Sequence, residues 1–594
     1  MSADTKEAGA GAAARVWSIS TGRSFLETLA HALLSGDFPQ PGGAPSDRLA
    51  LAGMTILLPT HRAVRALQEA FLRAANGRAL LLPRLVPIAE TDEDQGLITS
   101  MAGAQSPLAG EFVLGPAVAP LERQLALTHL VLAWSQQLRD AGQSPEGILA
   151  PLAAAGATTP AQAAHLAADL AQLMDMIETE EKSLHGLATL VPEEYSAHWQ
   201  QTITFLEIVT KFWPAHLAER GLLSGAARRN QLIRAEAERL RRTPPAEPVI
   251  VAGVTGSVPA TVALIRAVAQ LPAGAIVIPG LDRTLDETSW RALDHHPEHP
   301  QHDLYRLLGA LEVPREAVRE VAGKPAPARA AVRTAFLSEV MRPAGATKLW
   351  KDYVARADRA ELSAALEGIS RIDAPNSADE AEVIALMMRE ALETPGRTAA
   401  LVSPDRLLAR RVAIRLQSWG ITVDDSAGRP LAKTPHGAFL DLIAQAVATR
   451  FAPATVMALL KHPLTRLGLP VRDVRRAARF VELAALRTIY FGDGLDGIEA
   501  SLERAERETG DGSRRERAVR RLWDADWVAA RELLQRFRTA MTPLMTLAAE
   551  SAARELHVLA AAHRATADAL AAPGDETSPS RLWQDEDGEE ADRL

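Results

Sequence analysis

Hydrophobic periodicity in the first half of the chain predicts strands that alternate with helices. Residues 24–35 place their apolar side chains on one helical stripe, and a second amphipathic pattern runs from about Arg62 to Ala75 before Asn76-Gly77. The apolar runs between such helices lack the alternation of a half-exposed strand, which favours a parallel sheet buried on both faces. Four runs predict buried strands: Arg15–Ile19, Met54–Leu58, Pro248–Ala252 and Ala275–Ile278.

The same pattern begins again in the second half of the chain. Strands are predicted at Ile369–Ile372 and Thr398–Val402, followed by helices at Ala378–Leu392 and Arg406–Trp419. We therefore expect an α/β protein with two parallel-sheet domains that both carry a large helical insertion. The expected parts are a disordered tail (1–14), a first domain (15–330, insertion about 119–243), a connecting helical segment (331–368) and a second domain (369–594, insertion about 436–570).

Composition narrows the possible chemistry. A chain of 594 residues is too long for one hydrophobic core. It has no cysteine, which excludes disulfides, thiol nucleophiles, Cys-ligated zinc and an iron–sulfur cluster held within it. No apolar run approaches the roughly 20 residues of a membrane-spanning helix. Residues 1–14 lack the order of a secretory signal, so we expect a cytoplasmic protein with no membrane partner.

The turn after the first strand stands where a phosphate-binding loop would lie. Such a loop needs G-x-x-x-x-G-K-[ST], whose backbone N–H groups, lysine and hydroxyl hold phosphates and Mg²⁺. Here Thr21, Gly22, Arg23 and Ser24 form the end of the pattern, with Trp17 at the first glycine and Arg23 at the lysine. A forked guanidinium replaces the compact ammonium poorly. The turn is either a degenerate nucleotide loop or an ordinary strand-to-helix turn.

The acid that a hydrolysing site needs after a buried strand is also missing. Gly253–Ser257 follows one strand without a carboxylate, and Asp282 comes late, after a Pro-Gly break. We therefore expect no ATP hydrolysis and no catalytic residue in this chain. The histidine-rich segment 294–303 has two prolines that prevent helical ligand spacing, so we interpret it as a solvated loop without a metal. Asp424-Asp425 is interpreted as part of a turn.

Charge is distributed unevenly. The chain has a net charge of −9, yet residues 405–479 contain thirteen Lys or Arg and five Asp or Glu, a local charge of +8. This surface could neutralise nucleic-acid phosphates, or it could pair with acidic helices elsewhere. Residues 575–594 have eight acids and two arginines, typical either of a solvated tail or of a chain cut within a domain. The candidate DNA-binding residues are Arg406, Arg410, Arg411, Arg429, Lys433 and Lys461.

Several segments together resemble the AddB family, in its alphaproteobacterial form. They read R-V-W-S-I-S-T-G-R-S-F-L, M-T-I-L-L-P-T-H-R-A, V-I-V-A-G-V-T-G-S-V-P-A-T, I-V-I-P-G-L-D, A-A-L-V-S-P-D-R-L-L-A-R-R-V, D-D-S-A-G-R-P-L and L-L-K-H-P-L. AddB is the second subunit of the AddAB helicase–nuclease, which processes double-strand DNA breaks. The resemblance implies two superfamily-1 helicase-like (RecA-like) domains, a non-motor role and AddA as partner. It also implies binding to double-stranded ends and single-stranded DNA, with possible recognition of a recombination hotspot in the exiting strand.

Family members usually continue into a Mg²⁺-dependent nuclease domain, which in many of them an iron–sulfur cluster accompanies. No matching D/E-x-K arrangement precedes Leu594, so we expect an N-terminal fragment that itself holds no cofactor. Three functions remain open. The first is a catalytically silent, DNA-binding subunit of a repair complex; the second is a subunit whose full product carries a 5′–3′ exonuclease beyond residue 594; the third is a cytoplasmic interaction scaffold that binds no nucleic acid.

Overall fold

The structure is a computed structural model, and its contacts divide the chain into two compact units, Met1–Arg371 and Ile372–Leu594, which are described separately. The division falls close to residue 369, where the second domain was expected to begin. The expected tail at residues 1–14 lies outside the described part of the chain. The structure describes residues 15–36, 38, 49–88, 114–140, 159–182, 205–323, 326–426, 428–487, 493–510, 519–550, 554–574 and 580–593.

The first unit is built on a six-stranded, all-parallel sheet, which confirms the predicted α/β class. The strand order is β3-β2-β4-β5-β1-β6. All four predicted strands are present, and two short edge strands that periodicity did not predict complete the sheet. The strands are β1 (Val16–Ile19), β2 (Thr55–Leu58), β3 (Arg84–Pro87), β4 (Val249–Ala252), β5 (Gly274–Pro279) and β6 (Arg319–Glu320).

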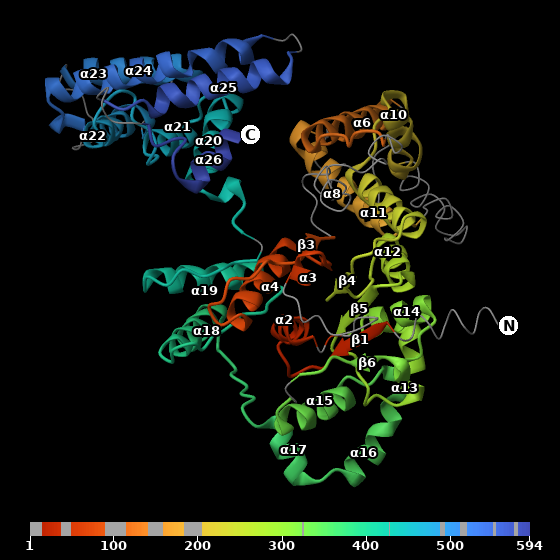
Figure 1. Ribbon diagram of the computed structural model, residues 1–594. Helices are drawn as coiled ribbons and strands as arrows, with labels where there is room; N and C mark the ends of the chain where they lie inside the picture. Colours follow the sequence, from red (N-terminus) through yellow and green to blue (C-terminus); the bar gives the residue numbers. More distant parts are fainter. Residues whose placement is uncertain are drawn as a thin grey trace. The chain divides into compact units, whose positions relative to one another are not determined.

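Helices cover both faces of this sheet (Figure 1). Ile250 and Ala252 of β4 face the core that contains α2 (Phe25–Ser35) and α4 (His61–Ala74). Val249 and Val251 of the same strand face the opposite core. The helices that contribute to that second core are α11 (Gly225–Arg242), α12 (Pro259–Gln270), α13 (Glu287–Ala292) and α14 (His302–Leu311). Burial on both sides explains the continuous apolar runs of the central strands.

A helical insertion between β3 and β4 has a separate core. It contains α6 (Pro120–Asp140), α8 (Pro160–Thr179) and α10 (Trp213–Arg220), and α11 then leads back to the sheet. Trp134 packs edge-on against Phe205 with ring centroids 4.9 Å apart, and Trp213 is fully buried beside them. After β6 the chain continues through three helices, α15 (Ala328–Val340), α16 (Trp350–Arg356) and α17 (Arg359–Leu366).

The second unit begins with two helices, α18 (Ser377–Leu392) and α19 (Arg406–Ser418). The strands expected at Ile369–Ile372 and Thr398–Val402 are not formed, which corrects the sequence prediction. A strand needs a hydrogen-bonded neighbour, and no strand occurs among the described residues of this unit. Leu401 still packs beneath α18 and α19, whereas the Val402 side chain is 94% exposed.

The remainder of the second unit is a helical bundle around a core that includes Phe439, Trp527 and Phe537. The acidic end is not simply a solvated tail: Leu582 is fully buried, and Arg564 lies over the Trp583 ring at 4.7 Å. The helices are α20 (Pro435–Ala448), α21 (Pro453–Leu460), α22 (Val471–Val481), α23 (Gly494–Gly510), α24 (Asp524–Ala549), α25 (Leu556–Ala571) and α26 (Asp585–Arg593). Among the described residues, no helix combines the length and apolar character needed to cross a membrane.

Candidate functional site

The loop between β1 and α2 lies at the carboxyl end of β1, which is flanked in the sheet by β5 and β6. Ligands of open α/β sheets bind at this edge. Just before the loop, the buried Ser18 hydroxyl of β1 accepts a hydrogen bond at 3.3 Å from the N–H of Leu281, in the segment after β5. The candidate nucleotide loop therefore lies at the edge of the sheet where open α/β sheets bind their ligands.

Arg23 turns into the protein rather than toward a ligand. Its side chain is only 9% exposed, and its guanidinium donates to the carbonyl oxygens of Val321 at 2.8 Å and Ala322 at 3.3 Å. Gly323 leaves the space for it, since a Cβ at that position would lie 2.3 Å from Arg23 Nη2. The planar fork suits two carbonyl acceptors on one segment better than an ammonium does. Arg23 therefore joins the β1–α2 loop to the segment after β6.

Glu320 supplies the anion of this loop. Its Oε1 accepts a hydrogen bond from Ser20 N–H at 2.7 Å and lies 3.6 Å from Arg23 Nη1. In a phosphate-binding loop, such backbone N–H groups point at phosphate oxygens. Here a carboxylate of the same chain takes one of those donors. Sequence reasoning missed Glu320, because β6 is only two residues long and carries no apolar pattern.

Helix α15 lies against the other residues of the loop. Gly22 has φ +89°, and a Cβ on it would come within 2.6 Å of Ala330 Cβ. The hydroxyls of Thr21 and Thr334 are hydrogen-bonded at 2.9 Å. Ser24 is exposed and precedes α2 without capping it through its side chain. The structure thus brings the four predicted loop residues together and places Glu320 and α15 against them.

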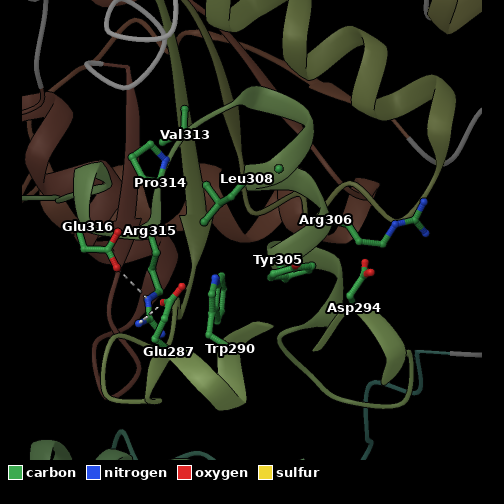
Figure 2. Close-up of a pocket in the computed structure, with 11 residues that line it drawn as sticks. Glu287, Trp290, Asp294, Tyr305, Arg306, Leu308, Val313, Pro314, Arg315 and Glu316 are labelled. Carbon is green, nitrogen blue, oxygen red and sulfur yellow. Dashed lines mark ion pairs between the residues drawn. The ribbon is translucent and has the colours of Figure 1, made fainter. Parts of the chain in front are cut away.

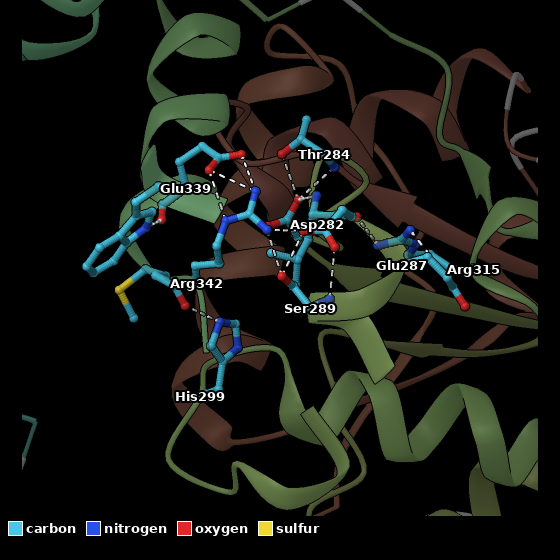
Figure 3. A network of polar contacts seen from close by, with 12 residues as sticks. Asp282, Thr284, Glu287, Ser289, His299, Arg315, Glu339 and Arg342 are labelled. Carbon is cyan, nitrogen blue, oxygen red and sulfur yellow. Dashed lines mark hydrogen bonds and ion pairs between the residues drawn. The ribbon is translucent and has the colours of Figure 1, made fainter. Parts of the chain in front are cut away.

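Asp282, the late acid after β5, closes its own turn. Its Oδ1 accepts hydrogen bonds from Thr284 N–H at 2.8 Å and Leu285 N–H at 3.0 Å. It belongs to the polar network in Figure 3, in which Arg342 donates to Asp286 and Ser289 and pairs with Glu339. Partial burial acts to raise the pKa of Asp286, but the hydrogen bonds from Ser289 and Arg342 hold this pKa below its ordinary value. Through Arg342, this network joins the end of α15 to the start of α13.

The histidine-rich segment is only partly the solvated loop that was expected. His302 is buried and donates from Nδ1 to the Leu293 carbonyl at 2.7 Å. His299 donates from Nε2 to the Met341 carbonyl at 2.8 Å, and partial burial lowers the pKa of its imidazole (Figure 3). These two rings are used to connect helices. Within the described ranges, no group of three or more His, Asp or Glu side chains is arranged to hold a metal.

A surface pocket of about 490 Å³ lies beside α13 and α14 (Figure 2). Trp290 and Tyr305 meet edge-on in it with ring centroids 5.5 Å apart. Arg315 lies over the Trp290 ring at 4.8 Å and pairs with Glu287 and Glu316 at 3.8 and 3.6 Å. The aromatic face is therefore already covered by a cation of the same chain.

Four of the six candidate DNA-binding residues have partners within the chain. Arg406 pairs with Asp425 at 3.0 Å, and Lys461 pairs with Glu482 at 2.6 Å. The hydrogen bond from Lys461 is the main cause that lowers the pKa of Glu482. The other two pairs are Arg411 with the Ser377 hydroxyl and Arg429 with Asp587.

The two remaining candidates, Arg410 and Lys433, are exposed and form no ion pair with a described residue. The six residues are spread over α19, the segment before α20 and the end of α21. They do not line one continuous element. The alternative that basic residues here pair with acids of the same chain therefore describes three of the six positions, and a fourth, Arg411, hydrogen-bonds a serine hydroxyl.

Comparison with known proteins assigns neither a family nor a function to this chain. No protein-family model matches the chain, and no curated protein matches it significantly. The geometry described above and the resemblance of the sequence segments are therefore the basis for a function.

Proposed function

We propose that this chain is a nucleotide-independent, helicase-like subunit that binds DNA in a complex that repairs double-strand breaks. One observation carries the proposal: the β1–α2 loop is filled by groups of the same chain. Glu320 accepts a hydrogen bond from the Ser20 N–H, and Arg23 donates hydrogen bonds to two backbone carbonyls. A helicase-type sheet whose phosphate loop is closed in this way suits a subunit that holds DNA while another subunit moves it.

Electrostatics supports this interpretation. A triphosphate in this loop would have to displace the carboxylate of Glu320 and would otherwise meet its negative charge at close range. Arg23 could not compensate, because turning its guanidinium outward would leave the Val321 and Ala322 carbonyls without their donor. We therefore propose that the chain neither binds nor hydrolyses ATP.

The partners follow from the resemblance to AddB and belong to the same proposal. They are an AddA-type helicase–nuclease subunit, double-stranded ends and the single strand that leaves them, in the cytoplasm. The proposal also includes recognition of a recombination hotspot sequence, but it assigns no residue to that role. A nuclease beyond residue 594 would add Mg²⁺ chemistry outside this chain.

A protein scaffold that binds no nucleic acid is the second candidate. It is favoured by the internal partners of Arg406, Arg411, Arg429 and Lys461, which reduce the basic surface left for phosphates. The two candidates differ in one property, which is binding to DNA ends.

The test is co-purification with an AddA subunit, followed by binding of the complex and of this chain alone to duplex ends. The proposal expects complex formation and end binding by this chain that ATP does not change and that weakens steeply with salt. A chain that joins AddA and adds no DNA affinity would support the scaffold instead. A chain that does not join AddA would refute the assignment to this complex.

A further inference from the structure

We propose that the exposed face of α22, here called the α22 arginine stripe (Arg472, Arg475, Arg476 and Arg479), binds the phosphate backbone of nucleic acid. The proposal rests on the DNA-binding function proposed above and assigns it to a surface. Two residues of the stripe, Arg475 and Arg479, form no ion pair with a described residue, whereas Arg476 pairs with Asp526 and Arg472 lies near Asp473.

The helix geometry places the four arginines together. Spacings of three, four and seven residues put side chains on one face of a helix, and Arg472 and Arg479 are about 10 Å apart along its axis at 1.5 Å per residue. The opposite face, Val474, Ala477, Ala478 and Val481, is buried in the core of the bundle. That burial fixes the rotation of the helix, so the arginines face solvent.

The four arginines differ in whether a carboxylate already pairs with them. Arg475 and Arg479 are exposed and have no carboxylate partner in the described part of the chain. Arg476 reaches Asp526 at 2.8 Å, with its guanidinium 5.4 Å from the centre of the Phe480 ring, and its side chain stays 67% exposed. Arg472 is 87% exposed and lies 3.5 Å from Asp473.

Net charge on the stripe is high for its length. Asp473 is the only acid within α22, so the helix carries four positive charges and one negative charge. Figure 1 shows α22 beside α23 and α24 in the bundle, where it packs on α24. Arg475 and Arg479, which have no carboxylate partner among the described residues, can bind anions without breaking an ion pair.

A phosphodiester backbone matches the charge and the length of this row. Duplex DNA carries one charge per roughly 1.7 Å of axis, so about six phosphate charges lie within the length of the stripe. Guanidinium groups bind phosphate oxygens through two parallel hydrogen bonds.

The experiment compares the full chain with the double variant Arg475→Ala/Arg479→Ala by fluorescence anisotropy, on labelled single-stranded DNA and on duplex ends over a range of salt concentrations. Both residues are exposed, and a thermal melt checks the fold. If the melting temperature of the alanine variant differs from that of the wild type, Arg475→Gln/Arg479→Gln is used in its place. The matched control, Arg487→Ala/Arg504→Ala, removes two exposed arginines of the same unit that are paired with Glu482 and Glu508.

The proposal expects dissociation constants to rise on the order of tenfold for the stripe variant, with the slope of log K against log salt reduced by about two. The control variant should bind as the wild type does. Unchanged affinity and slope in the stripe variant, with wild-type DNA binding intact, would overturn the stripe and leave the proposed function standing. Absence of DNA binding by the wild type would overturn the proposed function itself. Loss of AddA capture without loss of DNA binding would reassign the stripe to a protein partner.

Discussion

Glu320 accepts a hydrogen bond from the backbone N–H of Ser20, with 2.7 Å between Oε1 and N, across a separation of 300 residues in the chain. β6 pairs in parallel with β1, and this pairing delivers the carboxylate to the first turn of the sheet. A donor of the phosphate-loop type is thus satisfied from within the fold.

Replacing Glu320 by alanine should destabilise the first unit. The variant leaves Ser20 N–H without its acceptor and removes the carboxylate beside Arg23. Loss of a hydrogen bond to a charged group corresponds to about 1.5–3 kcal/mol, and this partly exposed pair should fall at the lower end of that range. Urea denaturation measures the change. The control Glu316→Ala removes an exposed carboxylate near Arg315 and should change stability by less than about 0.5 kcal/mol. Equal free energies of unfolding for the two variants would contradict a stabilising role for Glu320 in the β1–α2 loop.

Restoring the lysine of the nucleotide motif should not restore nucleotide binding. In Arg23→Lys, one ammonium replaces a fork that donates to two carbonyls, so we expect a loss of about 1 kcal/mol in stability. Glu320 and α15 still occupy the loop, so MgATP should give no heat of binding in titration calorimetry. Saturable MgATP binding by the variant would show that Arg23 alone closes the loop.

A methyl group at Gly22 should disturb the loop more than one at another glycine. Gly22→Ala combines a left-handed backbone with a contact to Ala330, which together should destabilise by about 1–3 kcal/mol. Gly309→Ala is the matched control, because its Cβ would enter open space within α14 and should stabilise by about 0.5–1 kcal/mol. The melting temperatures of the two variants should change in opposite directions, and a Gly22→Ala variant that melts at or above the wild-type temperature would contradict the close contact with α15.

Acid should weaken the second unit through His462. Its ring stacks on Phe439 with centroids 5.0 Å apart, and burial, assisted by nearby His436, lowers its pKa from 6.5 to about 4. The unfolded chain therefore binds a proton at this site at a higher pH than the folded chain does. The stability contributed by the neutral ring is complete above about pH 6.5 and is lost as the pH falls toward about 4.

The variant His462→Phe keeps a ring without a titrating nitrogen, so its stability should fall less between pH 6.5 and 4 than that of the wild type. Denaturation midpoints across this range measure the difference. The matched control His557→Phe makes the same change at an exposed ring of the same unit. If the stability of His462→Phe fell with pH as steeply as that of the wild type, His462 would not be the source of the acid sensitivity.

Much of the first unit could be predicted from periodicity, because β1, β2, β4 and β5 are apolar runs buried on both faces. The edge strand β6 could not, since a two-residue exposed strand has no apolar pattern. The predicted strands Ile369–Ile372 and Thr398–Val402 show the opposite error, because local sequence favours extended backbone but cannot supply a neighbouring strand.

The candidate site was predicted in the same uneven way. The position of Thr21, Gly22, Arg23 and Ser24 followed from a local motif. Glu320 depends on a pairing between distant segments, which no local pattern encodes. The partners of Arg406 and Arg429 were equally hidden, since Asp425 and Asp587 approach them only through the tertiary fold. For the same reason, the exposed α22 arginine stripe emerged only when the buried face of its helix was known.

Binding of MgATP to the wild-type chain, measured by titration calorimetry, tests the central claim most directly. The claim is that Glu320, Arg23 and α15 occupy the β1–α2 loop, and it predicts no saturable heat at any ratio of nucleotide to protein. Saturable, magnesium-dependent binding of ATP to the wild-type chain would contradict it.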